Sequence, residues 1–113
     1  ELLEGVACAQ AYSAEEVAQL VGGAEALGLE VIPLIQTLGH LEFVLKHSRF
    51  AAMREDEDDY GTLCPCDNVA AQLVEALIGA VLAFHPRCTT VHIGCDEPTL
   101  GVSERTKAAA AQD

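Results

Sequence analysis

The clearest hydrophobic pattern near the start of the chain predicts a helix over residues 14–27. Ser13 and Glu16 form a capping-box pattern, in which each side chain can bond the backbone N–H of the other residue. Apolar residues then recur at helical spacing, and Gly28 is placed to end the helix.

Two further helical patterns follow. Residues 41–54 carry the weaker one, with an expected break near His47-Ser48. A longer helix is predicted to start at Asp67 or Asn68 and to reach Phe84, just before a His-Pro pair that disfavours helix. Its apolar residues are Val69, Leu73, Leu77, Ala80, Val81 and Phe84.

Two short apolar runs, residues 30–35 and 90–93, predict strands. The first is apolar on both faces, as in a buried parallel sheet, although Pro33 removes one backbone donor from it. Strands that alternate with helices indicate parallel βα units joined by right-handed crossovers. The predicted fold class is therefore α/β.

A chain of 113 residues with two such strands is short for this class. Two parallel strands would leave sheet edges open and apolar faces uncovered. A complete (β/α)8 barrel needs about 250 residues. We therefore expect residues 1–113 to be a piece of a larger fold.

The net charge of the chain limits the kinds of partner it is expected to bind. Six basic residues against 18 acidic ones give a net charge of −12, which argues against nucleic acid and against an anionic membrane surface. No apolar run is long enough to predict a transmembrane span. The dense acidic stretch at residues 55–60 is expected to be a solvated loop.

The cysteines do not form a disulfide or zinc pattern. Their number is odd, their spacing is irregular, and Cys64-Pro65-Cys66 is too close for a CxxC half-site. Reduced thiols in a reducing compartment are expected. The five are Cys8, Cys64, Cys66, Cys88 and Cys95.

Candidate chemistry lies where the second strand ends. Gly94 breaks the apolar run, and the adjacent acids Asp96 and Glu97 follow almost at once. The carboxyl ends of parallel strands are where active sites are built, and paired acids there suit proton transfer to a glycosidic oxygen. The alternative is that the two acids only decorate a helix N-terminus.

Two histidines are candidates to lie beside Asp96 and Glu97. His40 follows Gly39 just past the first strand, so it would lie near the acids if the two strands are neighbours. His92 lies within the second strand, where a hydrogen-bonded core histidine is the expected role. A metal site from His40, His92, Asp96 and Glu97 is an alternative, but no HExxH or i,i+4 His pair supports it, so no metal is expected.

These residues carry a family resemblance. His92-Ile93-Gly94-Cys95-Asp96-Glu97 resembles the His-x-Gly-Gly-Asp-Glu signature of glycoside hydrolase family 20, the β-N-acetylhexosaminidases. Residues 30–40 resemble the strand of that family that ends in Gly-His. One branch of the family shares the Gln-Thr-x-Gly-His version, seen here at residues 36–40, and has Cys at the second Gly position of the signature.

The resemblance implies that residues 1–113 are part of the family's catalytic (β/α)8 barrel, around its third and fourth strands. The implied reaction is retaining exo-hydrolysis of a terminal β-linked N-acetylhexosamine, with N-acetylgalactosamine favoured in this branch. The substrate supplies its own nucleophile, and no cofactor is needed. The resemblance also implies a cytoplasmic location, with the nucleus as a further one, and leaves a homodimer open.

The same resemblance implies roles for individual residues. Glu97 would be the general acid and then the base, and Asp96 would accept a hydrogen bond from the 2-acetamido N–H of the sugar. His40, His92 and Gln36 would support these acids or contact the substrate. The 113 residues alone are expected to be inactive.

The alternative is a non-catalytic sugar-binding protein or inactive half-barrel relative that retains the motif. Three departures from the family pattern bear on it. Cys64-Pro65-Cys66 replaces an Asn-Pro-His-like stretch, the residues after Glu97 lack the expected tyrosines, and there is no tryptophan to wall a sugar pocket.

Overall fold

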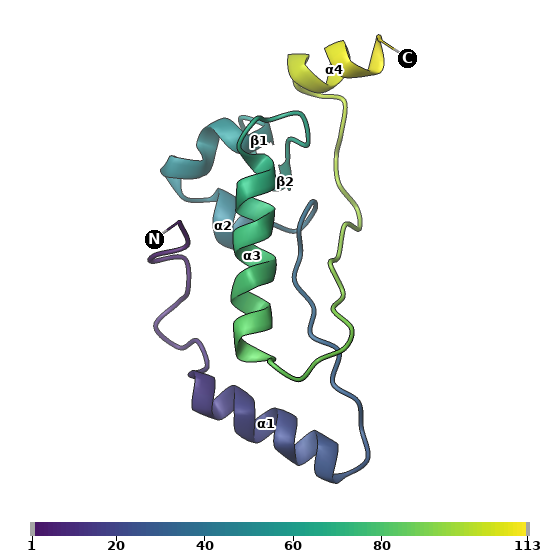
Figure 1. The fold of residues 1–113 in the computed structure, drawn as a ribbon. Coiled ribbons are helices and arrows are strands. Elements are labelled where there is room, and N and C mark those ends of the chain that lie inside the picture. The colour runs from purple at the N-terminus through teal and green to yellow at the C-terminus, as the bar shows by residue number, and fades with distance from the viewer. Residues whose placement is uncertain (1, 113) are drawn as a thin grey trace.

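The computed structural model describes residues 2–112. It contains helices and one two-stranded sheet, arranged as Figure 1 shows. The elements in chain order are α1 (Ala14–Ala26), α2 (Glu42–Leu45), the 3-10 helix η1 (Ser48–Met53), β1 (Arg54–Asp56), β2 (Asp59–Leu63), α3 (Ala70–Phe84) and α4 (Glu104–Ala110). Among the described residues, no helix combines the length and apolar character that crossing a membrane requires.

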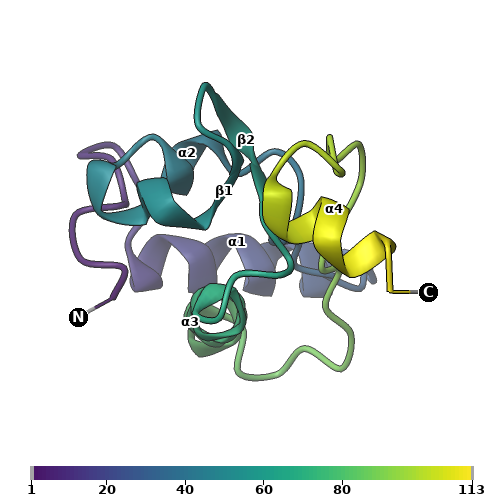
Figure 2. The same ribbon diagram turned by 90° about the horizontal axis from the view of Figure 1, so that it is seen from above.

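The predicted capping box of α1 is confirmed. The Glu16 N–H donates to Ser13 Oγ at 3.2 Å, and the Ser13 N–H donates to Glu16 Oε2 at 2.8 Å. Gly28, with φ +77°, follows directly after the helix and its cap residue. The helix runs crosswise to α3 and buries none of its own residues, so capping and local propensity define it more than packing does (Figures 1 and 2).

The core lies between α2, η1, the sheet and α3. The predicted break in the second helical pattern is confirmed, because α2 ends at Leu45 and η1 begins at Ser48. The long helix and its end are also confirmed, because α3 ends at Phe84 before the His-Pro pair; its predicted start was wrong, because α3 begins at Ala70 after the cap residue Val69 and not at Asp67 or Asn68. The buried cluster consists of Leu41, Val44, Leu45, Phe50, Met53, Leu63, Ala70, Leu73 and Leu77.

The prediction of a solvated loop at residues 55–60 holds for the exposed turn at Glu57 and Asp58 and was wrong for the strand residues on either side of it. This acidic stretch contributes to the antiparallel hairpin β1–β2, in which Arg54 pairs with Leu63 and Asp56 with Asp59. Glu55 is only 2% exposed. An isolated buried carboxylate would be costly, but this one accepts several hydrogen bonds from the segment around α4, which the pattern of acids alone does not reveal.

The two predicted strands are correct in direction but not in regularity. Residues 30–35 and 90–93 lie side by side and parallel, joined by a single bridge between Leu34 and His92. The His92 N–H donates to Pro33 O at 2.8 Å, and the Ile35 N–H donates to His92 O at 2.9 Å. In the described part of the chain no other strand pairs with either segment, which explains why the ladder is so short.

The expected burial of both faces of residues 30–35 was also wrong. Ile32 and Leu34 are exposed, and so is Ile93 on the neighbouring segment. No described element covers these faces, because the helices and the hairpin form their core elsewhere. Figure 1 shows the two segments as extended chain beside α3.

Candidate active site

The candidate site forms where the two parallel segments leave their bridge and turn into loops. Residues 36–40 come from the first segment and residues 94–97 from the second. Thr37 joins them, because its Oγ1 donates to Ile93 O at 2.7 Å and lies 3.1 Å from Cys95 Sγ. Thr37 is buried, so this link is shielded from solvent. Sequence reasoning missed Thr37, which has no titratable group to draw attention to it.

Two glycines let the loop backbones touch. A Cβ atom on Gly39 would lie 2.2 Å from the Asp96 carbonyl oxygen. A Cβ atom on Gly94 would lie 1.9 Å from Gln36 Oε1, and Gly94 also has φ +71°. Both distances are far inside van der Waals contact, so a larger residue at position 39 would displace the backbone of the opposite loop, and one at position 94 would displace the Gln36 side chain.

The structure brings His40 to both acids. His40 Nε2 lies 3.3 Å from Asp96 Oδ2 and 3.3 Å from Glu97 Oε2. Adjacent residues of a regular strand would point to opposite faces, but the backbone turns here and lets both carboxylates meet one imidazole ring. The side chains of His40, Asp96 and Glu97 are 43%, 56% and 80% exposed, so the site is open to solvent.

Backbone strain is concentrated at this site. The non-glycine residues with positive φ are His40 at +56°, Cys95 at +76° and Glu97 at +51°, among the described residues. Such conformations are unfavourable for residues with a Cβ atom and are typical of sites whose geometry serves function. The Thr37 hydrogen bond between the loops, and the close approach that the two glycines permit, contribute to this shape.

The electrostatics keep Asp96 ionised. The side-chain amide of Gln36 makes the largest contribution to lowering the pKa of Asp96, through hydrogen bonding, and the Asp96 backbone N–H adds to it. Slight burial opposes this shift, while the charges of His40 and His92 lower the pKa further. Gln36 therefore lies against both Gly94 and Asp96.

His92 differs from its expected role. It is exposed rather than a core residue, because residues 90–93 have an uncovered face. Its Nδ1 accepts a hydrogen bond from the Gly94 N–H at 3.0 Å, which steadies the turn that leads to the acids. It does not join the cluster in which His40, Asp96 and Glu97 hold their ligand atoms within 4.8 Å of one another.

That cluster has the donor types to bind a cation, with one imidazole nitrogen and two carboxylate oxygens. The same three groups also form two ion-pair contacts, with His40 Nε2 beside each carboxylate, and these contacts need no metal. The pKa of Asp96 is already explained by Gln36, the backbone and the histidines. Chelator treatment separates these two uses of the cluster.

Comparisons with known proteins agree with this geometry. The family model described as "Glycosyl hydrolase family 20, catalytic domain" matches residues 3–112. The chain is similar to Hexosaminidase D of Homo sapiens, with 48% identity over 87 residues that cover 77% of this chain and 18% of that protein. It is also similar to Hexosaminidase D of Bos taurus, with 45% identity over 87 residues, 77% of this chain and 25% of that protein.

The chain thus spans about a fifth to a quarter of the length of the relatives it matches. The match to the family model nonetheless covers almost all of its residues, including both loops of the site. On this evidence, the chain belongs to glycoside hydrolase family 20.

Proposed function

We propose that the protein containing this chain is a retaining β-N-acetylhexosaminidase that acts by substrate-assisted catalysis. The observation that carries the proposal is the convergence of Asp96 and Glu97 on His40 at the end of two parallel segments in a family 20 chain. The hexosaminidase relatives support the substrate class.

In the first step, Glu97 donates its proton to the glycosidic oxygen as the bond from that oxygen to C1 breaks. The carbonyl oxygen of the 2-acetamido group attacks C1 and forms a cyclic oxazolinium ion. The Asp96 carboxylate accepts a hydrogen bond from the acetamido N–H, which orients the carbonyl oxygen and stabilises the positive charge. The lowered pKa of Asp96 favours this ionised form.

In the second step, the Glu97 carboxylate takes a proton from water as the water oxygen attacks C1. The oxazolinium ring opens, the acetamido group is restored, and Glu97 regains its proton. Two displacements at C1 leave the product with the β configuration of the substrate. His40 and Gln36 support the two acids throughout, and His92 steadies the turn before them.

We also propose that the two parallel segments become neighbouring strands of a (β/α)8 barrel in the whole protein. Their exposed apolar residues Ile32, Leu34 and Ile93 need further elements to cover them. Completing the barrel would wall the open site and supply sugar contacts that these residues lack. For that reason, the 113 residues alone are expected to be inactive.

Substrate preference, location and assembly are further proposals. We expect N-acetylgalactosaminides to be preferred over glucosaminides, as the resemblance implies. We place the protein in the cytoplasm, and also in the nucleus, which is compatible with five cysteines that form no disulfide in the structure. A homodimer is one assembly that size measurement of the whole protein can test.

The direct test is hydrolysis of a chromogenic β-N-acetylhexosaminide by the whole protein. We expect NMR to show the β-hemiacetal as the first product, and a thiazoline mimic of the oxazolinium ion to inhibit competitively. Activity should persist after chelation. An α-anomeric first product, or sugar binding without any hydrolysis, would contradict the proposal.

A further inference from the structure

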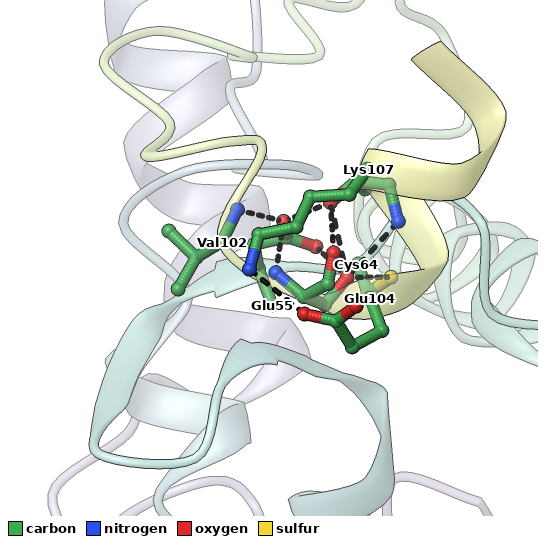
Figure 3. Close-up of polar contacts among 7 residues, drawn as sticks. Glu55, Cys64, Val102, Glu104 and Lys107 are labelled. Carbon is green, nitrogen blue, oxygen red and sulfur yellow. Dashed lines mark hydrogen bonds and ion pairs between the residues drawn. The ribbon is translucent and has the colours of Figure 1, made fainter. Parts of the chain in front are cut away.

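The buried carboxylate of Glu55 is the centre of a second polar cluster. It lies on β1 and is 2% exposed, whereas the neighbouring Glu57 and Asp58 face solvent. Figure 3 shows Glu55 directed toward the segment that precedes α4. A buried carboxylate with this many donors is a strong attachment point, because bonds to charged groups are stronger than neutral ones.

The attachment is extensive. Glu55 Oε1 accepts from the Val102 N–H at 2.9 Å and from the Ser103 N–H at 3.0 Å. Its Oε2 accepts from the Ser103 hydroxyl at 3.0 Å, and the Thr106 hydroxyl donates to Oε1. Ser103 also caps α4, since its Oγ accepts from the Thr106 N–H at 3.1 Å. The start of α4 is therefore fixed to β1.

A second attachment lies closer to the acid pair. Thr62 on β2 is buried, and its Oγ1 accepts from the Thr99 N–H at 3.1 Å. Thr99 is two residues after Glu97. The chain that leaves the acid pair is thus held on the hairpin at Thr99 and again from Val102 onward.

The same hairpin also holds the loop that carries His40. The Leu63 N–H donates to Leu38 O at 2.9 Å, and the Leu41 N–H donates to Gly61 O at 2.9 Å. Leu38 and Leu41 bracket Gly39 and His40 in the sequence. One hairpin therefore fixes both the His40 loop and the chain that follows Glu97.

We propose that Glu55 is a positioning residue for Glu97: by anchoring residues 102–106 on the hairpin, it reinforces the hold of Thr62 on Thr99 and sets the general acid relative to His40. The inference rests on the proposed function. Glu97 needs such help, because its side chain is 80% exposed, its φ is positive, and its one side-chain ion pair or hydrogen bond among the described residues is with His40. A misplacement of about 1 Å in a catalytic group can cost about a hundredfold in rate.

The test compares two leaving groups in the whole protein. A 2,4-dinitrophenyl glycoside departs with little need of a proton, whereas a methyl or sugar aglycone needs the general acid. We expect Glu55→Gln to lower kcat/KM for the poor leaving group by about tenfold or more, but by about twofold or less for the good one. A loss of folded enzyme would lower both equally.

Matched variants keep the test decisive. Glu104→Gln makes the same chemical change on an exposed carboxylate whose one ion pair within residues 2–112 is with Lys107, and it should leave both rates unchanged. If Glu55→Gln does not fold, Thr62→Val, which removes only the bond to Thr99, should show the same bias at about threefold. Equal losses on both glycosides, or none, would overturn the positioning role, whereas a wild-type protein inactive on both would instead overturn the proposed function.

Discussion

Glu55 and Glu97 are the same residue type in opposite settings. Glu55 is 2% exposed and accepts hydrogen bonds from two backbone N–H groups and two hydroxyls. The Glu97 side chain is 80% exposed, its φ is +51°, and its one ion pair or hydrogen bond among the described side chains is with the His40 ring. The first carboxylate is satisfied and holds the fold together. The second is unsatisfied and available to a substrate.

The regions around Glu55 and Glu97 differ in the same way as the two side chains do. The hairpin region joins the buried cluster through Leu63, while the loop region combines three strained non-glycine residues with solvent exposure. Strain of this kind persists only where the surrounding structure enforces it. The two regions are therefore complementary, since the hairpin supplies the rigidity that the loops lack.

The largest expected effect comes from Glu97→Gln, which removes the transferable proton but keeps the side-chain shape. We expect kcat/KM of the whole protein for a poor leaving group to fall by about 10² to 10⁴-fold. Because the side chain is exposed, thermal unfolding should be unchanged. Turnover at the wild-type rate would show that Glu97 is not the acid.

The second-largest loss of activity is expected from Asp96→Asn. The neutral amide cannot stabilise the positive oxazolinium ion, so we expect a loss of about 10² to 10³-fold in kcat. Inhibition by the thiazoline mimic should weaken in parallel, which a general loss of folding would not produce. Unchanged thiazoline affinity would remove Asp96 from contact with the acetamido group.

Gly39→Ala tests how closely the loops must approach. The added methyl group would meet the Asp96 carbonyl oxygen at 2.2 Å, so the acid pair must move away from His40. We expect about a hundredfold loss of activity from such a shift. Gly79→Ala, on the exposed side of α3 with nothing within 4 Å, is the control and should be neutral or slightly stabilising. Equal activity of the two variants would contradict the close packing.

The last prediction concerns the stability of the Glu55 attachment, and its dependence on pH, and not catalytic activity. Burial raises the pKa of Glu55, but hydrogen bonds from Thr106, Ser103, Cys64 and Val102 outweigh it and lower the pKa from 4.5 to about 2. Because the folded pKa is lowered, this stabilisation of about 3 kcal/mol is present above pH 4.5 and is lost as pH falls toward 2.

Amide hydrogen exchange can measure the stabilisation by Glu55 at the backbone groups that the carboxylate binds. Protection of the Val102 and Ser103 N–H groups should fall between pH 4.5 and 2 in the wild-type protein. In Glu55→Gln the protection should be lower from the start and independent of pH across this range. Equal protection in both proteins would show that the carboxylate does not hold the segment.

Local signals in the sequence determined several features correctly. The capping box of α1, the end of α3 and the break between α2 and η1 depend on residues a few positions apart, so their causes are readable from spacing. The two site motifs were also readable, because glycines and acids at strand ends carry their own chemistry. The parallel direction of the two segments followed from their alternation with helices.

Only the tertiary structure decided the rest. Glu55 is buried because donors 47 to 51 residues away enclose it, a fact that no local pattern of acids contains. Thr37 links the loops through Ile93, 56 residues away, and the predicted strands lack regularity because no further described strand pairs with them. In each case the deciding energy lies in contacts between distant segments, which are set by how the chain packs and not by which residues are neighbours along it.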